Sequence, residues 1–543
     1  MKTIPTIFLT LLLGAVTSAS AGETLYNGIQ LPSPWPPTDM VLKTGEPTPV
    51  PYLKDPPAVI PIDVGRQLFV DDFLIESTTL QRVHHLAEIH TGNPILKADQ
   101  PWETDRKGPM AMPFSDGVWF DPKDQLFKMW YIAGYLRQTA YATSRDGLHW
   151  EKPSLNVKAG TNVVHVGGRD SNTVWLDSEE TDPQRRFKMW TMTGGKGGFR
   201  YVLRFSPDGI HWGDPVLQTA ISGDRSTVFW NPFRKVWVYS LRTTTGPRAR
   251  RYWEVKDLLA GPQWEKIADA VPWTGSDRLD PMRDDLKTTP QLYNVDAVGY
   301  ESVMLGLFSI WHGDKNIPPG RPKPNSICVG YSRDGFHWDR PDRRPFIGVS
   351  ENAGDWNWGN VQSAGGCCLV VGDRLWFYFS GRAGMGPKNH DSNGATGLAF
   401  LRRDGFASMD AGQSEAVLTT RRVKFSGNRL FVNLAAASGE FRAEVLDKDN
   451  KPIAPFTAEN CQPLQLDKTL AVVTWTGPAD LSKLSGQPVK FRFHLKNGAL
   501  YAFWVTPDAS GASHGYIAAG GPGFTSNRDT VGTKGYDAAR KLN

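Results

Sequence analysis

Three aspartates stand before three similar hydrophobic segments of the chain. Asp116 lies two residues before the segment VWFDP, whereas Asp170 and Asp224 lie four residues before VWLD and VFWNP. Because side chains alternate along a strand, these even spacings place all three carboxylates on one face of their strands. Hydrolysis of a glycosidic bond needs one protonated carboxyl group and a second, ionised carboxylate nearby. The pattern therefore predicts convergent catalytic carboxylates, provided that the three strands surround one axis.

The neighbours of the three aspartates suggest different roles for them. Asp116 stands beside Gly117, which leaves room for a sugar ring or a water, so we predict that Asp116 is the ionised base or nucleophile. Asp224 is the predicted proton donor, with Asp170 raising its pKa by repulsion. This assignment requires Arg225 to point at the substrate rather than to pair with Asp224. Three other acids stay open as the proton donor, namely Asp285, Asp296 and Glu301, and each aspartate could instead cap a turn before its strand.

Further side chains suit the binding of a sugar. Indole rings stack on sugar faces, Asn and Gln bond hydroxyl groups, and His or Arg beside a glycine suits a pocket rim. Arginine also binds carboxylates and sulfates through two nitrogens, which favours an anionic sugar such as a uronate or a sulfated residue. Packing and ion pairing are the alternatives for these types. The predicted substrate-binding residues are Arg225, Asn294, His312, Trp356, Trp358, Asn360, Gln362 and Arg382.

One seven-residue turn occurs three times and indicates the scaffold. Its copies are SRDGLHW at 144–150, SPDGIHW at 206–212 and SRDGFHW at 332–338. In each copy Asp can cap the backbone, Gly can adopt a positive φ, and Trp can pack between neighbouring sheets. Strand–turn–strand segments accompany the copies in five units of about 60 residues, a pattern typical of radial repetition. The sequence therefore predicts an all-β fold, a five-bladed β-propeller followed by a C-terminal β-sandwich.

The SxDGxxW turns resemble a shortened Asp-box of sialidases. The five-unit layout with an appended β-domain is similar to the five-bladed propeller glycoside hydrolases of families 32, 43 and 68, over residues 61–411. That resemblance implies acids distributed over the first three blades and a mechanism that requires no metal or other cofactor. The family motifs NDPNG and EC are absent, and Asp224 stands where the general acid of the family is usually Glu.

Shifts in composition divide the chain into five segments. Residues 7–16 are apolar but too few to span a bilayer, and the following ASA fits a signal-peptidase site. Short alternating strands separated by polar turns follow residue 412, and a Gly-rich tail ends the chain. The predicted domains are a signal peptide at 1–21, an N-terminal extension at 22–60, the propeller at 61–412, the β-sandwich at 413–510 and a flexible tail at 511–543.

Charge and cysteine content exclude several functions. The net charge is only +5 without a long Lys/Arg run, which argues against nucleic-acid binding. The densest basic cluster, Arg248, Arg250 and Arg251, is interpreted as a solvated loop. Four cysteines match no zinc spacing and suit buried thiols. No later segment reaches the length of a membrane span, so we predict a secreted or periplasmic protein.

Together these features predict an exported glycoside hydrolase that acts on a complex polysaccharide or its oligosaccharides. Two alternatives stay open. A non-catalytic glycan-binding propeller would keep the tryptophans without needing three acids, whereas a sialidase-like enzyme would fit the Asp-box likeness but has six blades rather than five units.

Overall fold

The protein is described by a computed structural model that covers residues 22–539, except 39, 41, 43, 44, 106, 107, 168, 196, 197, 244, 245, 314, 315, 322, 385–392, 478 and 479. Strands make up 42% of the structure and helices 4%, which confirms the predicted all-β class. The predicted signal peptide lies outside the described residues. Within them, no helix is long and apolar enough to cross a membrane.

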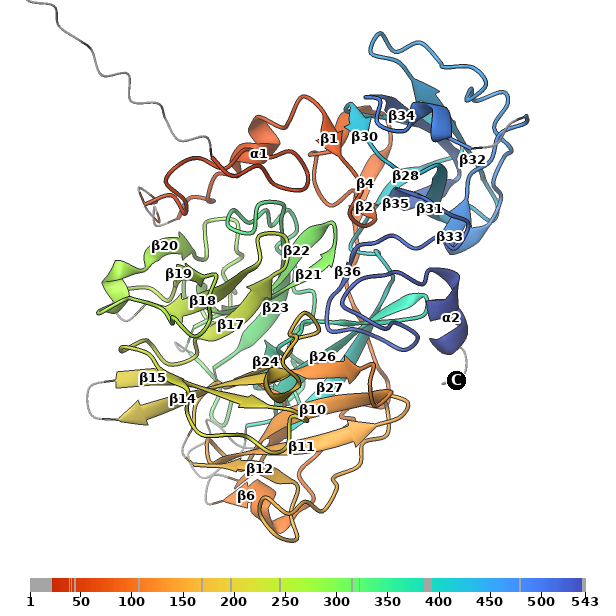
Figure 1. Ribbon diagram of the computed structural model, residues 1–543. Helices are drawn as coiled ribbons and strands as arrows, with labels where there is room; N and C mark the ends of the chain where they lie inside the picture. Colours follow the sequence, from red (N-terminus) through yellow and green to blue (C-terminus); the bar gives the residue numbers. More distant parts are fainter. Residues whose placement is uncertain are drawn as a thin grey trace, which may run out of the picture.

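Five consecutive antiparallel sheets, here called blades 1 to 5, form the larger body in Figure 1. Blade 1 contains β8 (Ala111–Met112), β9 (Val118–Asp121), β10 (Leu126–Ala133), β11 (Gln138–Ser144) and β12 (Val163–Val166). Blade 2 contains β13 (Thr173–Leu176), β14 (Phe187–Gly195), β15 (Gly198–Ser206) and β16 (Leu217–Gln218). Blade 3 contains β17 (Thr227–Asn231), β18 (Val236–Arg242), β19 (Arg250–Val255) and β20 (Val271–Thr274). Blade 4 contains β21 (Gln291–Glu301), β22 (Val303–Trp311), β23 (Asn325–Ser332) and β36 (Tyr516–Ile517), and blade 5 contains β24 (Asn360–Ser363), β25 (Leu369–Val371), β26 (Arg374–Arg382), β27 (Gly394–Arg402) and β5 (Glu88–Ile89).

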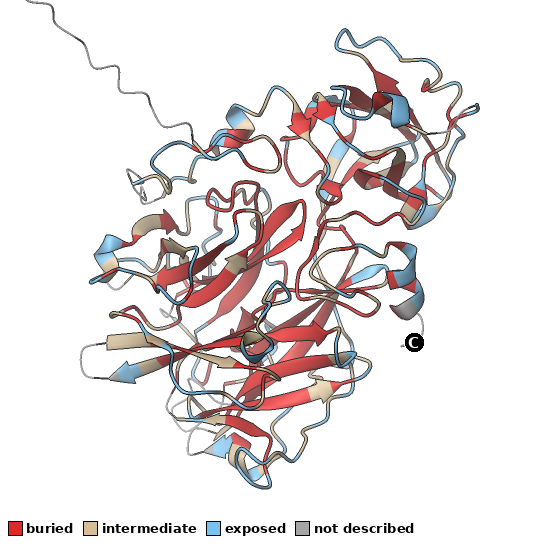
Figure 2. Cartoon of the chain, viewed as in Figure 1, coloured by how far each residue is buried: buried red, intermediate tan, exposed pale blue. Residues whose placement is uncertain are grey.

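Hydrogen bonds between the innermost strands join each blade to the next and close the ring. Val174 N of blade 2 donates to Asp116 O of blade 1 (2.7 Å), and Ser171 Oγ of blade 2 donates to Ser226 O of blade 3 (2.8 Å). Thr227 Oγ1 of blade 3 donates to Val295 O of blade 4 (2.8 Å), and Ser363 Oγ of blade 5 donates to Asp296 Oδ2 of blade 4 (2.5 Å). Val118 N of blade 1 donates to Gly365 O of blade 5 (3.2 Å) and closes the ring. The innermost strands β9, β13 and β17 begin two or three residues after Asp116, Asp170 and Asp224, the three aspartates from which the sequence predicts them. A propeller is therefore the architecture of residues 88–402, and its strands are buried along most of their length (Figure 2).

The repeated turns have the local structure that their sequence predicts. In the first copy, the Ser144 hydroxyl accepts a hydrogen bond from Gly147 N (2.8 Å). The Asp146 carboxylate accepts from the amides of Leu148 and His149 (2.8 Å each), and Gly147 has a φ of 76°. The turns at Ser206 and Ser332 repeat these bonds. Asp is therefore the cap of each turn, and Gly supplies the left-handed backbone.

Each turn is also bound to the preceding blade of the ring. The Tyr378 hydroxyl of blade 5 donates to Gly147 O, and Trp130 Nε1 of blade 1 donates to Gly209 O (2.7 Å each). Trp273 Nε1 of blade 3 donates to Phe336 O of the third turn (2.7 Å). The repeat thus fastens one blade to its neighbour and serves the scaffold rather than the chemistry.

We expect Gly209→Ala to destabilise the protein by about 2–4 kcal/mol, because a Cβ there would lie 2.4 Å from the Trp130 ring and the residue has a φ of 79°. Gly246→Ala is the matched control, since Gly246 has a φ of 72° but no atom within 4 Å of its added Cβ. Urea unfolding measures both. Equal losses in the two variants would show that the contact with Trp130 contributes nothing.

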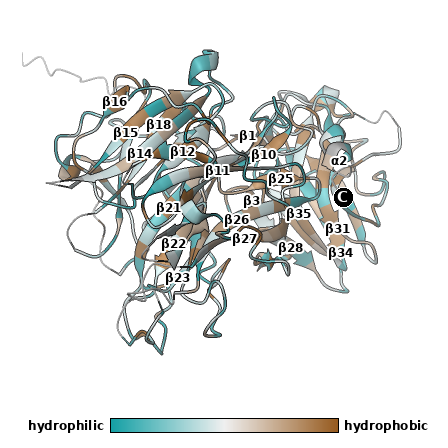
Figure 3. Cartoon of the chain, turned by 90° about the horizontal axis from the view of Figure 1, so that it is seen from below, coloured by the Kyte–Doolittle hydropathy of each residue, from teal (hydrophilic) through white to brown (hydrophobic). Residues whose placement is uncertain are grey.

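Two further sheets form the β-sandwich beside the propeller (Figures 1 and 3). One sheet contains β33 (Asp467–Val472), β31 (Arg429–Ala435), β35 (Gly498–Thr506), β28 (Ala407–Ala411), β4 (Gln81–His84) and β2 (Gln67–Leu68). The other contains β3 (Ile75–Thr78), β29 (Ala416–Thr420), β34 (Lys490–Lys496) and β32 (Glu440–Leu446), and β1 (Ile60–Pro61) pairs with β30 (Val423–Lys424). The prediction that the propeller begins at residue 61 is therefore wrong: residues 67–84 complete the sandwich, because their apolar side chains pack with those of residues 409–505.

The remaining described elements are short. They are α1 (Pro51–Lys54), β6 (Thr104–Asp105), β7 (Gly108–Pro109), α2 (Thr533–Ala539) and the 3-10 helices at Pro101–Glu103, Pro183–Arg185, Ile267–Asp269 and Ser482–Leu484. In the N-terminal extension, Leu25, Ile29, Leu31 and Tyr52 pack into the core of the sandwich. The extension is thus part of that body rather than a linker.

The predicted flexible tail is wrong for residues 511–539. Its strand β36 pairs with β21 of blade 4, where Ile517 faces Tyr300, and α2 ends the described chain. Asp529 is fully buried and forms an ion pair with Arg403 (2.9 Å). The tail has few apolar residues at regular spacing, so its sequence contains no local pattern that predicts a strand. Its ordered structure depends instead on its contacts with the propeller.

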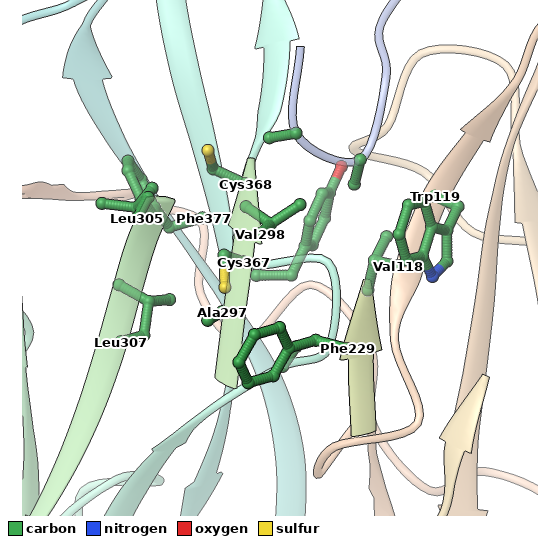
Figure 4. Packing of buried hydrophobic residues seen from close by; sticks show 14 of the residues in the cluster. Val118, Trp119, Phe229, Ala297, Val298, Leu305, Leu307, Cys367, Cys368 and Phe377 are labelled. Carbon is green, nitrogen blue, oxygen red and sulfur yellow. The ribbon is translucent and has the colours of Figure 1, made fainter. Parts of the chain in front are cut away.

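The four cysteines are free and buried, as predicted. Figure 4 shows Cys367 and Cys368 in the hydrophobic core, near Val298 of blade 4. Burial raises the pKa of all four thiols, so they are unreactive core side chains.

Candidate active site

Arg225 crosses the axis of the propeller. It precedes β17 of blade 3, yet its Nη1 donates to Ser115 Oγ of blade 1 (2.5 Å) and its Nε to Gln362 Oε1 of blade 5 (2.9 Å). Its guanidinium carbon lies 3.7 Å from the centre of the Phe114 ring. A φ of 49° at Arg225 turns the chain just before the strand and aims this side chain inward. Polar groups of three blades therefore meet at one point.

Asp296 of β21 reaches the same point from blade 4. Its Oδ2 accepts hydrogen bonds from Ser363 Oγ (2.5 Å), Asn294 Nδ2 (2.9 Å) and Ser115 Oγ (3.4 Å). The residue is 4% exposed, and no described cation forms an ion pair with it. Burial raises the pKa of Asp296, although the nearby charge of Arg225 opposes the rise. Asp296 is therefore a carboxyl group whose surroundings favour the protonated form.

Asp116 is fully buried and bound to Arg169 of blade 2. The two carboxylate oxygens accept from Nη1 and Nη2 of Arg169, each at 2.6 Å. Burial raises the pKa of Asp116, and the Arg169 charge opposes that rise. Arg169 Nε also donates to the backbone carbonyl of Asp170 (3.1 Å). Asp116 therefore holds Arg169, and through it Asp170, in position. Both of its carboxylate oxygens are occupied by hydrogen bonds to Arg169.

Asp170 retains a free oxygen. Its Oδ1 accepts from the amides of Ser171 (2.9 Å) and Arg225 (3.2 Å). Its Oδ2 accepts no hydrogen bond from the residues that the structure describes, and the side chain is partly exposed. Asp170 and Asp296 are therefore the two axial carboxyl groups whose oxygens remain open to a ligand.

The predicted convergence of three aspartates is wrong for Asp224. Its carboxylate forms an ion pair with Arg242, and both side chains are partly exposed. The prediction assumes that side chains alternate regularly from Asp224 into the strand. Because Arg225 has a left-handed backbone, that alternation is broken and Asp224 does not point to the axis. Arg225 itself does point to the axis and away from Asp224, as the sequence argument requires.

Two of the alternative proton donors lie elsewhere. Glu301 is at the opposite end of β21 from Asn294, where it forms ion pairs with Arg403 (3.1 Å) and Arg66 (3.5 Å). Asp285 is exposed and pairs with Arg283 (2.7 Å). Of the acids that the sequence leaves open, Asp296 alone reaches the axial cluster.

Two of the predicted binding residues support Arg225 rather than face outward. Asn360 Oδ1 accepts a hydrogen bond from Gln362 Nε2 (2.7 Å), and Gln362 in turn accepts from Arg225. Asn294 is fully buried, donates to Asp296 and leaves its Oδ1 without a hydrogen bond. The side-chain amides of Asn294, Asn360 and Gln362 therefore form a hydrogen-bonded network around Arg225 and Asp296.

The predicted aromatic and rim residues lie further from the axial cluster. Trp358 is buried (5% exposed) beside Arg321, and His312 bonds Ser326, with burial lowering its pKa to about 4. The half-buried Trp356 lies against the glycines at 381 and 397 of blade 5. Arg382 lies 5.6 Å from the Phe114 ring, so of these four it is nearest to Arg225. Trp356 and Trp358 therefore have packing roles in this structure.

Ser115, Arg169 and Arg250 also belong to the axial cluster, although no sequence pattern predicts them. Ser115 and Arg169 are next to predicted acids, but no strand pattern extends through the turns that contain them. Arg250 belongs to the cluster interpreted as a solvated loop and is instead fully buried, with its Nη1 bonded to Arg225 O (2.7 Å). Only the closure of the ring brings these residues together.

We expect Asp116→Asn to cost about 3–5 kcal/mol of stability, because it leaves the buried Arg169 charge unpaired. The matched control is Asp72→Asn, whose partner Arg82 forms an exposed pair worth less than about 1 kcal/mol. Thermal and urea unfolding of the two variants measure the difference. A stable Asp116→Asn protein would show that the pair contributes no net stability.

No family model and no curated protein sequence matches the chain. Among solved structures, a thermostable family-43 glycoside hydrolase is 12% identical with a TM-score of 0.38, over 57% of this chain and 96% of its own. A glycosyl hydrolase from Bacteroides ovatus is 13% identical with a TM-score of 0.38, over 62% and 97% of the two chains. A fructofuranosidase from Schwanniomyces occidentalis complexed with fructose is 10% identical with a TM-score of 0.35, over 77% and 97%.

Proposed function

We propose that this protein is a glycoside hydrolase whose active site is the axial cluster. The observation that carries the proposal is the unlike pair of carboxyl groups on one axis. Asp296 is buried and forms no ion pair with a described residue, whereas Asp170 is partly exposed and its Oδ2 accepts no hydrogen bond from those residues. Glycosidic hydrolysis uses two carboxyl groups in different protonation states, and their surroundings set those states.

In this mechanism Asp296 protonates the glycosidic oxygen as the bond to the leaving group breaks. Asn294 and Ser363 hold Oδ2 of Asp296, so Oδ1 is the oxygen that carries and delivers the proton. Asp170 acts from its Oδ2 as the ionised base or nucleophile. Asp116 is a positioning residue, because it acts on Asp170 through Arg169.

The substrate that we propose is the glycan of a complex polysaccharide or oligosaccharide, outside the cytoplasm if the predicted signal peptide directs export. A non-catalytic glycan-binding propeller is the second candidate. It is favoured by one observation: Asp116 and Asp224 are both committed to ion pairs with arginines.

The test is the release of reducing sugar from a panel of neutral and acidic polysaccharides by the wild-type protein. The control is Asp170→Asn, a substitution at a partly exposed position that should leave thermal unfolding nearly unchanged. Release by the wild type and its loss in the control would support the hydrolase. Glycan retention in affinity electrophoresis without release from any polysaccharide would favour the binding protein.

A further inference from the structure

Two arginines at the axis lack an anionic partner. Arg250 is fully buried, and its Nε and Nη2 have no hydrogen bond. Arg225 is 2% exposed, and its Nη2 also has none. Neither forms an ion pair with an acid in the part of the chain that the structure describes. The two side chains are adjacent, because Arg250 Nη1 bonds the backbone carbonyl of Arg225 (2.7 Å).

Such an arrangement is costly in the absence of a ligand. A buried charge without a partner loses several kcal/mol of hydration that nothing replaces. Burial, together with the charges of Arg225 and Arg242, lowers the pKa of Arg250 to about 9. Other buried arginines of this chain are paired: Arg333 bonds Asp71 (2.8 Å), and Arg403 bonds Asp529. Single arginine nitrogens without a hydrogen bond also occur elsewhere, as at Arg403 Nε, but Arg403 has an acid partner, whereas Arg225 and Arg250 have none among the described residues.

The charges around the two arginines leave a positive surplus. Arg169 is neutralised by Asp116, and Arg242 by Asp224. The acids that remain are Asp170 and Asp296, and Asp296 does not form an ion pair with Arg225.

We propose that Arg225 and Arg250 bind an anionic group of the sugar substrate, a carboxylate or a sulfate ester. Guanidinium groups bind such groups through two parallel hydrogen bonds. The inference rests on the proposed hydrolase and deepens it, because it names an acidic glycan as the substrate class. The site is next to both reactive carboxyls: Arg225 N bonds Asp170, and Ser115 Oγ bonds both Arg225 Nη1 and Asp296. The charged group would therefore lie on the sugar ring at which the bond is cut.

The experiment compares acidic polysaccharides with their neutral forms. Polygalacturonate and alginate are assayed beside their carboxyl-reduced products, and carrageenan beside its desulfated product, by affinity electrophoresis and by release of reducing sugar. We expect at least one acidic polymer to be retained about tenfold more strongly than its neutral form. Retention of a uronan indicates a carboxylate, and retention of carrageenan alone indicates a sulfate.

Arg225→Gln should abolish that preference, whereas Arg344→Gln, which removes the same charge from an exposed pair with Asp342, should keep it. Equal losses in the two variants would overturn the site, as would equal retention of acidic and neutral polymers. Should Arg225→Gln fail to unfold cooperatively, wild-type melting with glucuronate against glucose at equal ionic strength decides: a higher Tm with glucuronate supports the site, and no difference overturns it.

The two proposals fail separately. Retention of an acidic polymer without release of sugar from any polymer would refute the hydrolase and keep the anion site. Release of sugar from neutral polymers alone would keep the hydrolase and refute the anion site.

Discussion

Asp296→Asn is expected to lower the rate on natural glycosides by about 10³–10⁴-fold, because it removes the proton that the leaving oxygen needs. Glycosides with a dinitrophenyl leaving group need no proton, so we expect the variant to cleave them at a nearly unchanged rate. The wild-type rate on natural glycosides should fall as pH rises through the pKa of Asp296, since the reactive form is protonated. In the variant that alkaline limb should be absent.

The matched control for this prediction is Asp285→Asn. Asp285 is another acid that the sequence leaves open as a donor, but it is exposed and paired with Arg283. Its rates should equal those of the wild type on both classes of substrate. Full activity of Asp296→Asn on a natural glycan would place the proton donor elsewhere, whereas equal loss on both substrates would assign Asp296 to the other catalytic role.

Removal of residues 511–543 is expected to abolish the cooperative folding of the protein. The deletion takes β36 from the edge of blade 4 and withdraws three buried side chains from the core, those of Ile517, Ala519 and Phe524. It also leaves Arg403 without Asp529 in a fully buried site. Loss of a buried partner alone costs about 3–5 kcal/mol, and the loss of burial adds to it, so the sum approaches the total stability of a domain.

Calorimetry and near-UV circular dichroism of the shortened chain measure this effect. The control chain ends at Ala539 and keeps both α2 and the ion pair of Asp529. We expect it to melt like the full chain. A cooperative transition near the wild-type Tm in the shorter chain would show that the tail only covers a propeller that is stable without it.

Much of the fold could be predicted because its signals are local. The SxDGxxW turns hold their own hydrogen bonds within seven residues, so their sequence suffices to identify them. The inner strands β13 and β17 are short apolar runs that are buried along most of their length, and such runs are visible in the sequence. The tail and residues 67–84 could not be placed in this way, because their strands are two to four residues long and pair with segments several hundred residues away.

The candidate site was predicted only in part for the same reason. Asp170 precedes the inner strand β13, where a polar residue before an apolar run is visible in the sequence. The direction of Asp224 depends on one left-handed residue, Arg225, which a rule of alternation does not detect. Asp296 lies in the part of β21 that is buried without interruption, from residue 294 onward, so no alternation marks it in the sequence. The Ser115 and Ser363 hydroxyl groups that surround it come from other blades.

The strand β36, which pairs with the innermost strand β21 of blade 4, is contributed by residues 516–517, long after β21 in the sequence. During synthesis, all the other described strands therefore leave the ribosome before blade 4 can receive β36. Until then the growing chain presents an incomplete sheet with an open edge, and such edges invite pairing with other chains. Chaperones that hold unfolded chains should consequently bind this protein until translation is nearly complete.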